Sequence, residues 1–236
     1  MILHYRMIKP YFYFDKNNTF CISLESKPER WQKIHKRFQY FNLDVTKFPA
    51  SVGSNPNDIT DRFESYLNDG QKGCAQSHIN IWRYIQSKPE IPYVLILEDD
   101  ACFDKDWLLK LEQFSIDLSY EPNRLNTWEL ILLNASEPIY HREHLWTQVE
   151  EQFLTGGYII SQRGINAILN MFHPVYSSSD WMTSRLQMRW NSYSYFPWLI
   201  IQEGDESTIG SGVEADHRKV LDCLSRINYS LDNYII

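Results

Sequence analysis

The segment from Tyr93 to Asp100 joins a continuous apolar run to three consecutive acidic residues. The run Tyr93–Leu97 is apolar throughout, a pattern typical of a central strand covered on both faces of its sheet. Pro89 and Pro92 end the helix expected before it and lead into this strand. Such a strand needs helices on both sides, and its acidic residues then lie at its carboxyl end. The segment therefore predicts an α/β fold with polar side chains at one sheet edge.

Strands and helices are expected to alternate around this segment. Further strands are predicted at 19–24, 45–50, 128–133, 153–161 and 193–201, and helices from near residues 28, 73, 106, 162 and 180. Ser26 and Glu29 have the spacing of a capping box before the first helix. The alternation predicts a mostly parallel sheet flanked by helices. We expect a single domain over 1–236, with a core at about 19–209 and a C-terminal tail or flap at 210–236.

The charge balance excludes one class of function. The net charge is −7 and the sequence pI is about 5.5, and no run of Lys or Arg offers the basic face that nucleic-acid binding requires. Hydrophobic residues make up 43% of the chain, which is enough for a packed core. An acidic protein that handles a polyphosphate must neutralise that charge locally, and a bound cation is the simplest means.

The cysteines and the N-terminal segment indicate a compartment. Cysteines at 21, 74, 102 and 223 are far apart and form no CxxC pair, which argues against a zinc knot or a disulfide framework. Each is interpreted as a small core residue in a reducing compartment. The first 14 residues are interrupted by polar residues and a proline, unlike a signal peptide, and no run approaches the ~20 apolar residues of a membrane span. We therefore expect a cytoplasmic protein without a transmembrane segment.

The acidic residues Glu98, Asp99 and Asp100 are the first candidate site. Adjacent carboxylates repel one another, and burial favours their protonated forms. A hard divalent cation relieves both effects, because Mn²⁺ and Mg²⁺ prefer carboxylate oxygen. In an extended chain residues i and i+2 point the same way, so Glu98 and Asp100 are predicted to share one metal site while Asp99 faces elsewhere, unless the backbone turns there. A solvated acidic loop is the alternative, although the apolar flanks leave little open loop.

Two further segments contain candidate ligand-binding residues. His78 lies on the apolar face of the helix predicted from Gly73 and is interpreted as a core histidine, whereas Ser77 could contact a ligand from the helix start. The pair Gly156-Gly157 either lets the backbone approach a ligand or only allows a bulge.

Two side chains nearer the C-terminus could complete the site. Asp180 follows three serines and is a candidate general base, with a helix N-cap as the alternative. His217 could complete a metal shell, or it could be an exposed histidine.

In this order, these segments resemble glycosyltransferase family 25, which includes bacterial lipooligosaccharide glycosyltransferases and the collagen galactosyltransferases. The matching segments are Cys21–Leu24 with Arg30, Gly73–His78 with Trp82, Leu95–Asp100, Gly157–Ser161 with Ala167, then Asp180, and Ile201–Gln202 with Ser207. Gly70-Gln-Lys-Gly73 stands where the family usually carries Gly-Glu-Ile-Gly, and Trp31 replaces a second basic residue beside Arg30. These departures leave open which group holds the diphosphate.

The resemblance implies a GT-A fold, a nucleotide-sugar donor, usually a UDP-sugar, and a Mn²⁺-type cation. Asp100 would be a direct metal ligand, with Glu98 contacting the donor ribose or the metal through water, and His217 is kept as a third candidate ligand. The full set expected to bind the donor is Ser23, Leu24, Ser26, Arg30, Ala50, Ser51, Ser77, Glu98, Asp99, Gly156 and Gly157.

The expected reaction is transfer of the sugar to a hydroxyl on a glycan or glycosylated protein, with Asp100 and Asp180 as the catalytic residues. Asp180 would be the base if the sugar inverts and a positioning residue if its configuration is retained. Two rival functions stay open. An acidic cluster at a strand end also suits a metal-dependent phosphoesterase or nuclease, and a transferase fold can serve as a non-catalytic binding protein.

Overall fold

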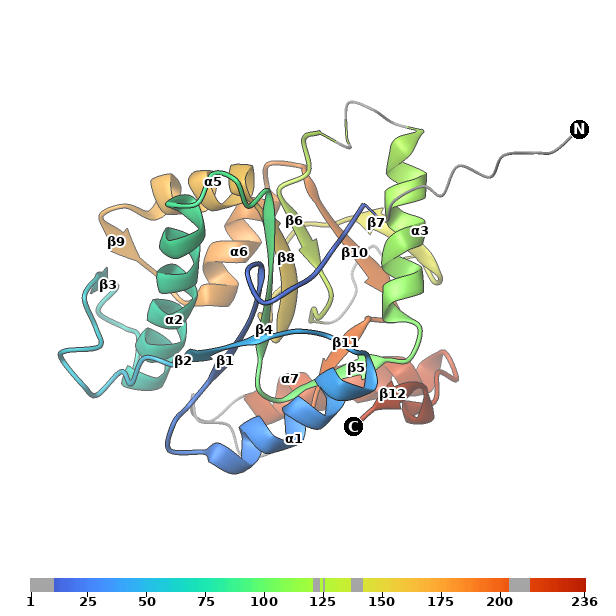
Figure 1. Cartoon of the computed structure of the whole chain (residues 1–236), viewed down its shortest axis with the longest axis horizontal. Helices are drawn as coiled ribbons and strands as arrows, with labels where there is room; N and C mark the ends of the chain where they lie inside the picture. The colour runs from blue at the N-terminus through green and yellow to red at the C-terminus, as the bar shows by residue number, and fades with distance from the viewer. Residues whose placement is uncertain (1–10, 121–123, 125, 137–141, 204–212) are drawn as a thin grey trace, which may run out of the picture.

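The computed structural model describes residues 11–120, 124, 126–136, 142–203 and 213–236 (Figure 1). The elements in chain order are β1 (Thr19–Ser23), α1 (Pro28–Tyr40), β2 (Thr46–Pro49), β3 (Arg62–Phe63), α2 (Asp69–Gln86), β4 (Tyr93–Glu98), β5 (Ala101–Asp104), α3 (Trp107–Ser119), β6 (Leu130–Leu132), β7 (Leu145–Gln148), β8 (Gly157–Ser161), α5 (Gln162–Phe172), β9 (Val175–Tyr176), α6 (Ser179–Gln187), β10 (Ser192–Phe196), β11 (Ile200–Gln202), α7 (Val213–Arg226), the 3₁₀ helix η1 (Leu231–Asn233) and β12 (Tyr234–Ile235).

The central sheet has seven described strands in the order β2-β1-β4-β8-β6-β10-β7. Strand β1 is parallel to β2 and β4, and β6 is parallel to β10. Strands β8 and β7 run antiparallel to their neighbours, so five of the seven strands share one direction. The prediction of a mostly parallel sheet flanked by helices is confirmed, and the arrangement is compatible with a GT-A-like fold.

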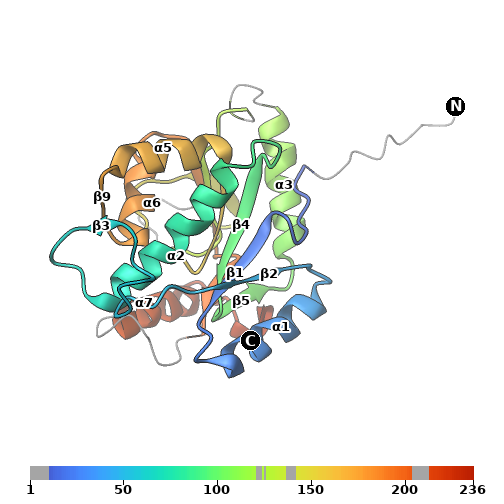
Figure 2. The ribbon, with the colours of Figure 1, turned by 60° about the vertical axis from the view of Figure 1, so that its left-hand side comes forward.

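Alternating side chains of the central strands build two hydrophobic cores. Val94 and Ile96 of β4 pack with residues of α2, α5 and α6 on one face of the sheet. Leu95 and Leu97 pack with α1 and α3 on the other face. Figures 1 and 2 show these helices on opposite sides of β4. Because both faces are covered, the apolar run is fully buried, as its sequence predicts.

A smaller sheet, ordered β11-β5-β12, adjoins the end of β4. Strand β5 starts at Ala101, immediately after the acidic residues, so the turn at Asp99 and Asp100 connects the two sheets. The single strand expected at 193–201 is divided into β10 in the large sheet and β11 in the small one. Pro197 lies between them, and its missing N–H cannot extend a ladder of backbone hydrogen bonds.

The C-terminal segment differs from the expected tail or flap. Over residues 213–226 it forms α7, whose Val220, Cys223 and Leu224 are buried in the first core, and β12 then pairs with β5. The buried positions follow the helical i, i+3, i+4 spacing within a largely polar stretch. Among the described helices, none combines the length and apolar character needed to cross a membrane.

The capping box expected at the start of α1 is not formed. Lys27, rather than Ser26, is the N-cap of α1, and it makes no side-chain cap bond. A complete capping box instead begins α2, where Asn68 and Gln71 satisfy each other's backbone N–H groups. That box fixes the start of the helix that carries the Gly73–His78 segment.

Candidate active site

A cavity of about 250 Å³ lies where the parallel strands β1, β2 and β4 end. The expected donor-binding residues that line it are Leu24, Arg30, Ala50, Ser51, Ser77, Glu98 and Asp99. Cys74 and His78 also line it. Ser23 is buried at the end of β1, and Ser26 is exposed in the following turn, outside the cavity lining. The cavity thus lies at the sheet edge that the strand pattern indicates.

One wall of this cavity is a contact between the loop at 50–54 and the first turns of α2. Ser77 Oγ donates to the Gly73 carbonyl at 2.7 Å and accepts from the Ser51 N–H at 2.8 Å. A Cβ atom at Gly73 would lie 2.5 Å from the Ser51 carbonyl oxygen, and one at Gly53 would lie 1.6 Å from that of Asp69. Both positions therefore require glycine, because the two backbones touch.

Arg30 forms ion pairs with two of the three acidic residues, Asp99 and Asp100. Arg30 Nη2 lies 2.5 Å from Asp99 Oδ1 and 3.6 Å from Asp100 Oδ2. Burial raises the pKa of Asp99 despite the Arg30 charge. Burial and the nearby Glu98 charge raise the pKa of Asp100 to about 7. The cluster thus holds more negative charge than Arg30 alone neutralises.

Glu98 accepts hydrogen bonds from three sides. Thr155 Oγ1 donates to Oε1 at 3.0 Å, His78 Nε2 lies 3.3 Å from the same oxygen, and Gln202 Nε2 lies 3.3 Å from Oε2. Burial would raise the pKa of Glu98, but the bonds from His78 and Thr155 bring it below the usual value. Glu98 is therefore held as an anion.

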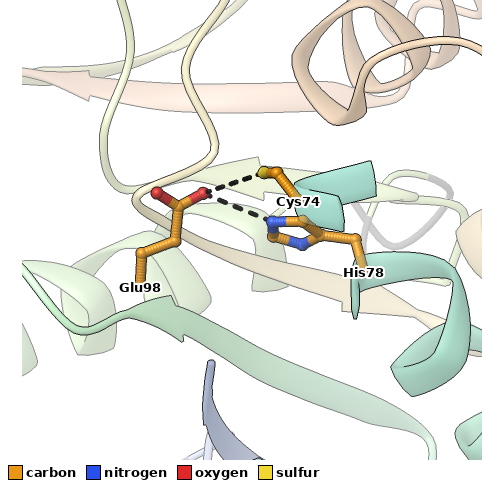
Figure 3. Close-up of side chains that lie close together, drawn as sticks. All are labelled: Cys74, His78 and Glu98. Atoms are coloured by element: carbon orange, nitrogen blue, oxygen red, sulfur yellow. Dashed lines mark hydrogen bonds and ion pairs between the residues drawn. The ribbon is translucent and has the colours of Figure 1, made fainter. Parts of the chain in front are cut away.

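A buried chain of hydrogen bonds sets the proton position on His78. An indole N–H only donates, so the Tyr158 oxygen accepts from Trp82 Nε1 at 3.0 Å. The Tyr158 O–H then donates to His78 Nδ1 at 2.8 Å. An imidazole that accepts at Nδ1 carries its proton on Nε2, which donates to Glu98. The interpretation of His78 as a buried, satisfied histidine is confirmed. Its ring points toward Glu98 (Figure 3), and His78 is among the residues that line the cavity.

Gln202 brings Glu98 and Asp100 to one point. Its Nε2 atom lies 3.3 Å from Glu98 Oε2 and 3.3 Å from each carboxylate oxygen of Asp100. The two carboxylates therefore face one position, but the chain turns at Asp99 and Asp100, so the i, i+2 rule for an extended chain is not the reason. Sequence reasoning did not select Gln202 as a site residue. Its only signal was its place in the closing segment of the family resemblance.

Asp180 lies near the same cavity at the start of α6. The adjacent Ser179 Oγ is 3.4 Å from Cys74 Sγ and 3.0 Å from Thr155 Oγ1. Burial raises the pKa of the Cys74 thiol well above its usual value, and the charges of Glu98 and Asp180 add to this effect. The N-cap of α6 is Ser178, so Asp180 does not have the N-cap role considered as its alternative.

The remaining predicted residues occupy other surroundings. His217 on α7 lines a second cavity of about 120 Å³, which Gln202 also lines. A Cβ atom at Gly156 would lie 2.7 Å from Gln202 Cγ, and one at Gly157 would lie 2.5 Å from Ile200 Cδ1. The close approach that these glycines allow is thus to side chains of β11. Within the described residues, the side chains with clustered metal-ligating atoms are Cys74, His78 and Glu98.

Comparison with known proteins gives consistent matches. A family model described as "Glycosyltransferase family 25 (LPS biosynthesis protein)" matches residues 16–183. A glycosyltransferase 25 family member of Drosophila pseudoobscura pseudoobscura is 38% identical over 103 residues, which cover 37% of this chain and 16% of that protein. Procollagen galactosyltransferase 1-A of Xenopus laevis is 26% identical over 65% of this chain and 28% of its own length.

A bacterial relative aligns over most of both chains. The lipooligosaccharide biosynthesis protein lic2B of Haemophilus influenzae is 23% identical over 228 residues, which are 86% of this chain and 84% of that protein. By contrast, this chain spans only 16% to 28% of the length of the insect family members.

Proposed function

Because the chain belongs to glycosyltransferase family 25, we propose that it transfers a sugar from a nucleotide-sugar donor, of the UDP type, to a hydroxyl group on a glycan or glycoprotein. The observation that carries this proposal is the convergence of Glu98 and Asp100 beside a cavity at the ends of three parallel strands. A polyphosphate ligand suits that edge if a cation offsets the carboxylates.

The residues present fit a divalent cation. Two carboxylates face one position that the Gln202 N–H group contacts, and burial leaves Asp100 with its pKa raised to about 7. Hard oxygen donors of this kind suit Mn²⁺ or Mg²⁺. We propose Asp100 and Glu98 as its ligands, with His217 from α7 as a further candidate. Such an ion supplies positive charge that stabilises the departing diphosphate.

The protein residues divide the remaining work. Leu24, Ala50 and Ser51 line the cavity and are proposed to surround the nucleoside part of the donor. Arg30 pairs with Asp99 and Asp100, lines the cavity, and is proposed to share its charge with the donor phosphates. These contacts would orient the sugar for attack at its anomeric carbon.

Asp180 is proposed as the residue that receives the acceptor proton. The acceptor oxygen bonds to the anomeric carbon as the bond to the diphosphate breaks, and the Asp180 carboxylate takes the hydroxyl proton if the configuration inverts. If the configuration is retained, Asp180 positions the acceptor. Its placement beside Ser179, which contacts Cys74 in the cavity wall, supports either role.

A thermal-shift panel of nucleotide sugars, with and without Mn²⁺, tests the proposal. We expect one donor to raise the melting temperature only when Mn²⁺ is present. The same panel with Asp100→Asn is the matched control and should show no metal-dependent shift. Stabilisation by nucleic acid would favour the phosphoesterase or nuclease alternative, and no donor-dependent shift at all would contradict a nucleotide-sugar site.

A further inference from the structure

The side chains of Cys74, His78 and Glu98 lie close together (Figure 3), with their possible ligand atoms within 4.8 Å of one another, and all three line the cavity. We propose that these three side chains form a second cation site, specific for Zn²⁺, that competes with the hard-cation site for Glu98. The zinc site stands on these side chains alone. Its inhibitory effect on sugar transfer rests on the proposed function.

The positions of the three side chains follow from the fold. Cys74 and His78 are four residues apart on α2, so they lie on the same face of the helix. Glu98 ends β4, opposite that face. Cys74 Sγ lies 4.0 Å from Glu98 Oε1 and His78 Nε2 lies 3.3 Å from it. Tetrahedral zinc with bonds of about 2.0–2.3 Å places its ligand atoms roughly 3.3–3.8 Å apart, so small side-chain movements suffice.

The donor atoms select the kind of ion. One thiolate, one imidazole and one carboxylate are ligands typical of Zn²⁺, whereas Mn²⁺ and Mg²⁺ favour oxygen donors such as Glu98 with Asp100. All three side chains line the cavity, which gives the ion an entry path and leaves a fourth position for water. The two ion types therefore use different partners of the same glutamate.

Each proposed ligand also has a partner that orients it. Tyr158 contacts His78 Nδ1 at 2.8 Å, Thr155 contacts Glu98 at 3.0 Å, and the Ser179 hydroxyl lies 3.4 Å from Cys74 Sγ. Outer partners of this kind fix the ring and carboxylate orientations in zinc sites.

Zinc binding requires two proton movements. The Cys74 thiol releases its proton to solvent, and the His78 proton moves from Nε2 to Nδ1, which then donates to the Tyr158 oxygen. That oxygen still accepts from Trp82, so the Tyr158 O–H loses its acceptor. The loss of one buried hydrogen bond is small beside the free energy with which thiolate and imidazole bind zinc.

Cobalt(II) is the probe, added to the full chain without nucleotide sugar. We expect one equivalent to give a thiolate-to-cobalt charge-transfer absorption that one equivalent of Zn²⁺ removes. Cys74→Ala should abolish this absorption, and the matched control Cys223→Ala, at a buried cysteine of α7, should retain it. No absorption in the unsubstituted chain, or an unchanged absorption in Cys74→Ala, would overturn the proposal.

A second measurement on the unsubstituted chain covers the case in which Cys74→Ala does not fold. Zn²⁺ should slow alkylation of Cys74 at least tenfold, as followed by peptide mass mapping, whereas Mg²⁺ should not. Equal rates with and without Zn²⁺ would overturn the site.

Sugar transfer in Mn²⁺ then tests the competition. One equivalent of Zn²⁺ should reduce the rate at least tenfold, and an unchanged rate would overturn the competition. A cobalt–thiolate absorption in a chain without transferase activity would leave the zinc site standing and reject the proposed function. Normal transferase activity without that absorption would do the reverse.

Discussion

Two groups of side chains surround the acidic residues, and Glu98 and Asp100 have carboxyl pKa values shifted in opposite directions. We call His78 with Thr155 the α2 side, and Gln202 of β11 the β11 side. On the α2 side, Thr155 and His78 donate to Glu98, and its pKa lies below the usual value although burial opposes this. On the β11 side, the Asp100 carboxylate shares a single Gln202 amide with Glu98, and burial raises its pKa to about 7. Glu98 is therefore an anion without a bound cation, because His78 and Thr155 stabilise its charge. Asp100 needs added positive charge to ionise fully.

The β11 side is nevertheless well held through its backbone. The buried Arg37 side chain donates to the Ala101 carbonyl at 2.9 Å and to Glu203 Oε2 at 3.0 Å. The Glu203 N–H in turn donates to the Asp100 carbonyl at 2.9 Å. The position of Asp100 is thus fixed, while Arg30, at 3.6 Å, compensates the charge of its carboxylate only in part. A cation site needs this combination, since fixed ligands with unmet charge bind an ion well.

The largest expected effect comes from removing the undercompensated carboxylate. Asp100→Ala should reduce Mn²⁺-dependent sugar transfer by about 10³-fold or more, because the cation loses its proposed direct ligand. The rate is measured at saturating Mn²⁺, and circular dichroism checks that the variant is folded. Transfer at the normal rate by a folded variant would remove the metal assignment from the β11 side.

The next effect concerns the stability of the metal-free protein. A carboxyl pKa raised on folding stabilises the fold at low pH, and this contribution is lost as the pH rises from about 4 through about 7. Asp100→Asn stays neutral, so at pH 8.5 in chelator it should be more stable than the parent by roughly 4 kcal/mol. Near pH 4 the difference should vanish.

Urea unfolding at the two pH values measures this difference. Glu98→Gln is the matched variant on the α2 side and should destabilise the protein at pH 8.5, since the pKa of Glu98 is lowered. A change of the same sign in both variants would contradict the contrast between the two sides.

A smaller effect is expected on the α2 side itself. Tyr158→Phe should reduce the free energy of unfolding by about 2 kcal/mol, because the buried Trp82 N–H and His78 Nδ1 both lose their partner. Urea unfolding near pH 7 gives the value, and Tyr66→Phe, at an exposed tyrosine, is the control with a lesser loss. An equal loss of unfolding free energy in both variants would show that the hydrogen bonds of Tyr158 to Trp82 and His78 add no stability beyond that of an exposed tyrosine hydroxyl.

The smallest effect is expected at the residue that the two sides share. Gln202→Met should lower metal-free stability by about 1 kcal/mol, because Glu98 and Asp100 lose a common donor. Saturating Mn²⁺ should abolish the difference, since the ion takes over the position. Melting curves with and without Mn²⁺ check this, and a deficit that persists with the ion would assign Gln202 a role in packing instead.

Local pattern was enough to predict the α2 side in outline. The apolar run of β4 needs covered faces wherever it lies, which places the acidic residues at a sheet edge. The i, i+2 rule predicts a common direction for Glu98 and Asp100, but the turn at Asp99 and Asp100 sets their direction instead. The helical face that carries His78 follows from periodicity alone. The burial of Tyr158 could not be predicted in this way. A tyrosine on a strand gives the same sequence pattern whether its hydroxyl contacts water or a histidine.

The β11 side depends on long-range pairing that a local pattern does not encode. Gln202 reaches the site because β11 pairs with β5 antiparallel, with Gln202 opposite Ala101. Pro197 ends β10, and the chain then crosses to the small sheet that contains this pairing. The buried face of α7 consists of a few apolar residues at helical spacing within a polar stretch. They are buried because the helix packs against the first hydrophobic core. Tertiary contacts therefore determine which residues reach the site on the β11 side.

The backbone contact between Gly53 and Gly73 has a consequence for engineering. Libraries that aim to enlarge or reshape the cavity gain nothing from varying these two positions, since any side chain there forces the 50–54 loop away from α2. Val52 and Ser54 also line the cavity and lie on either side of Gly53. Randomising these two neighbours while both glycines are kept would vary the shape of the cavity and leave its wall intact.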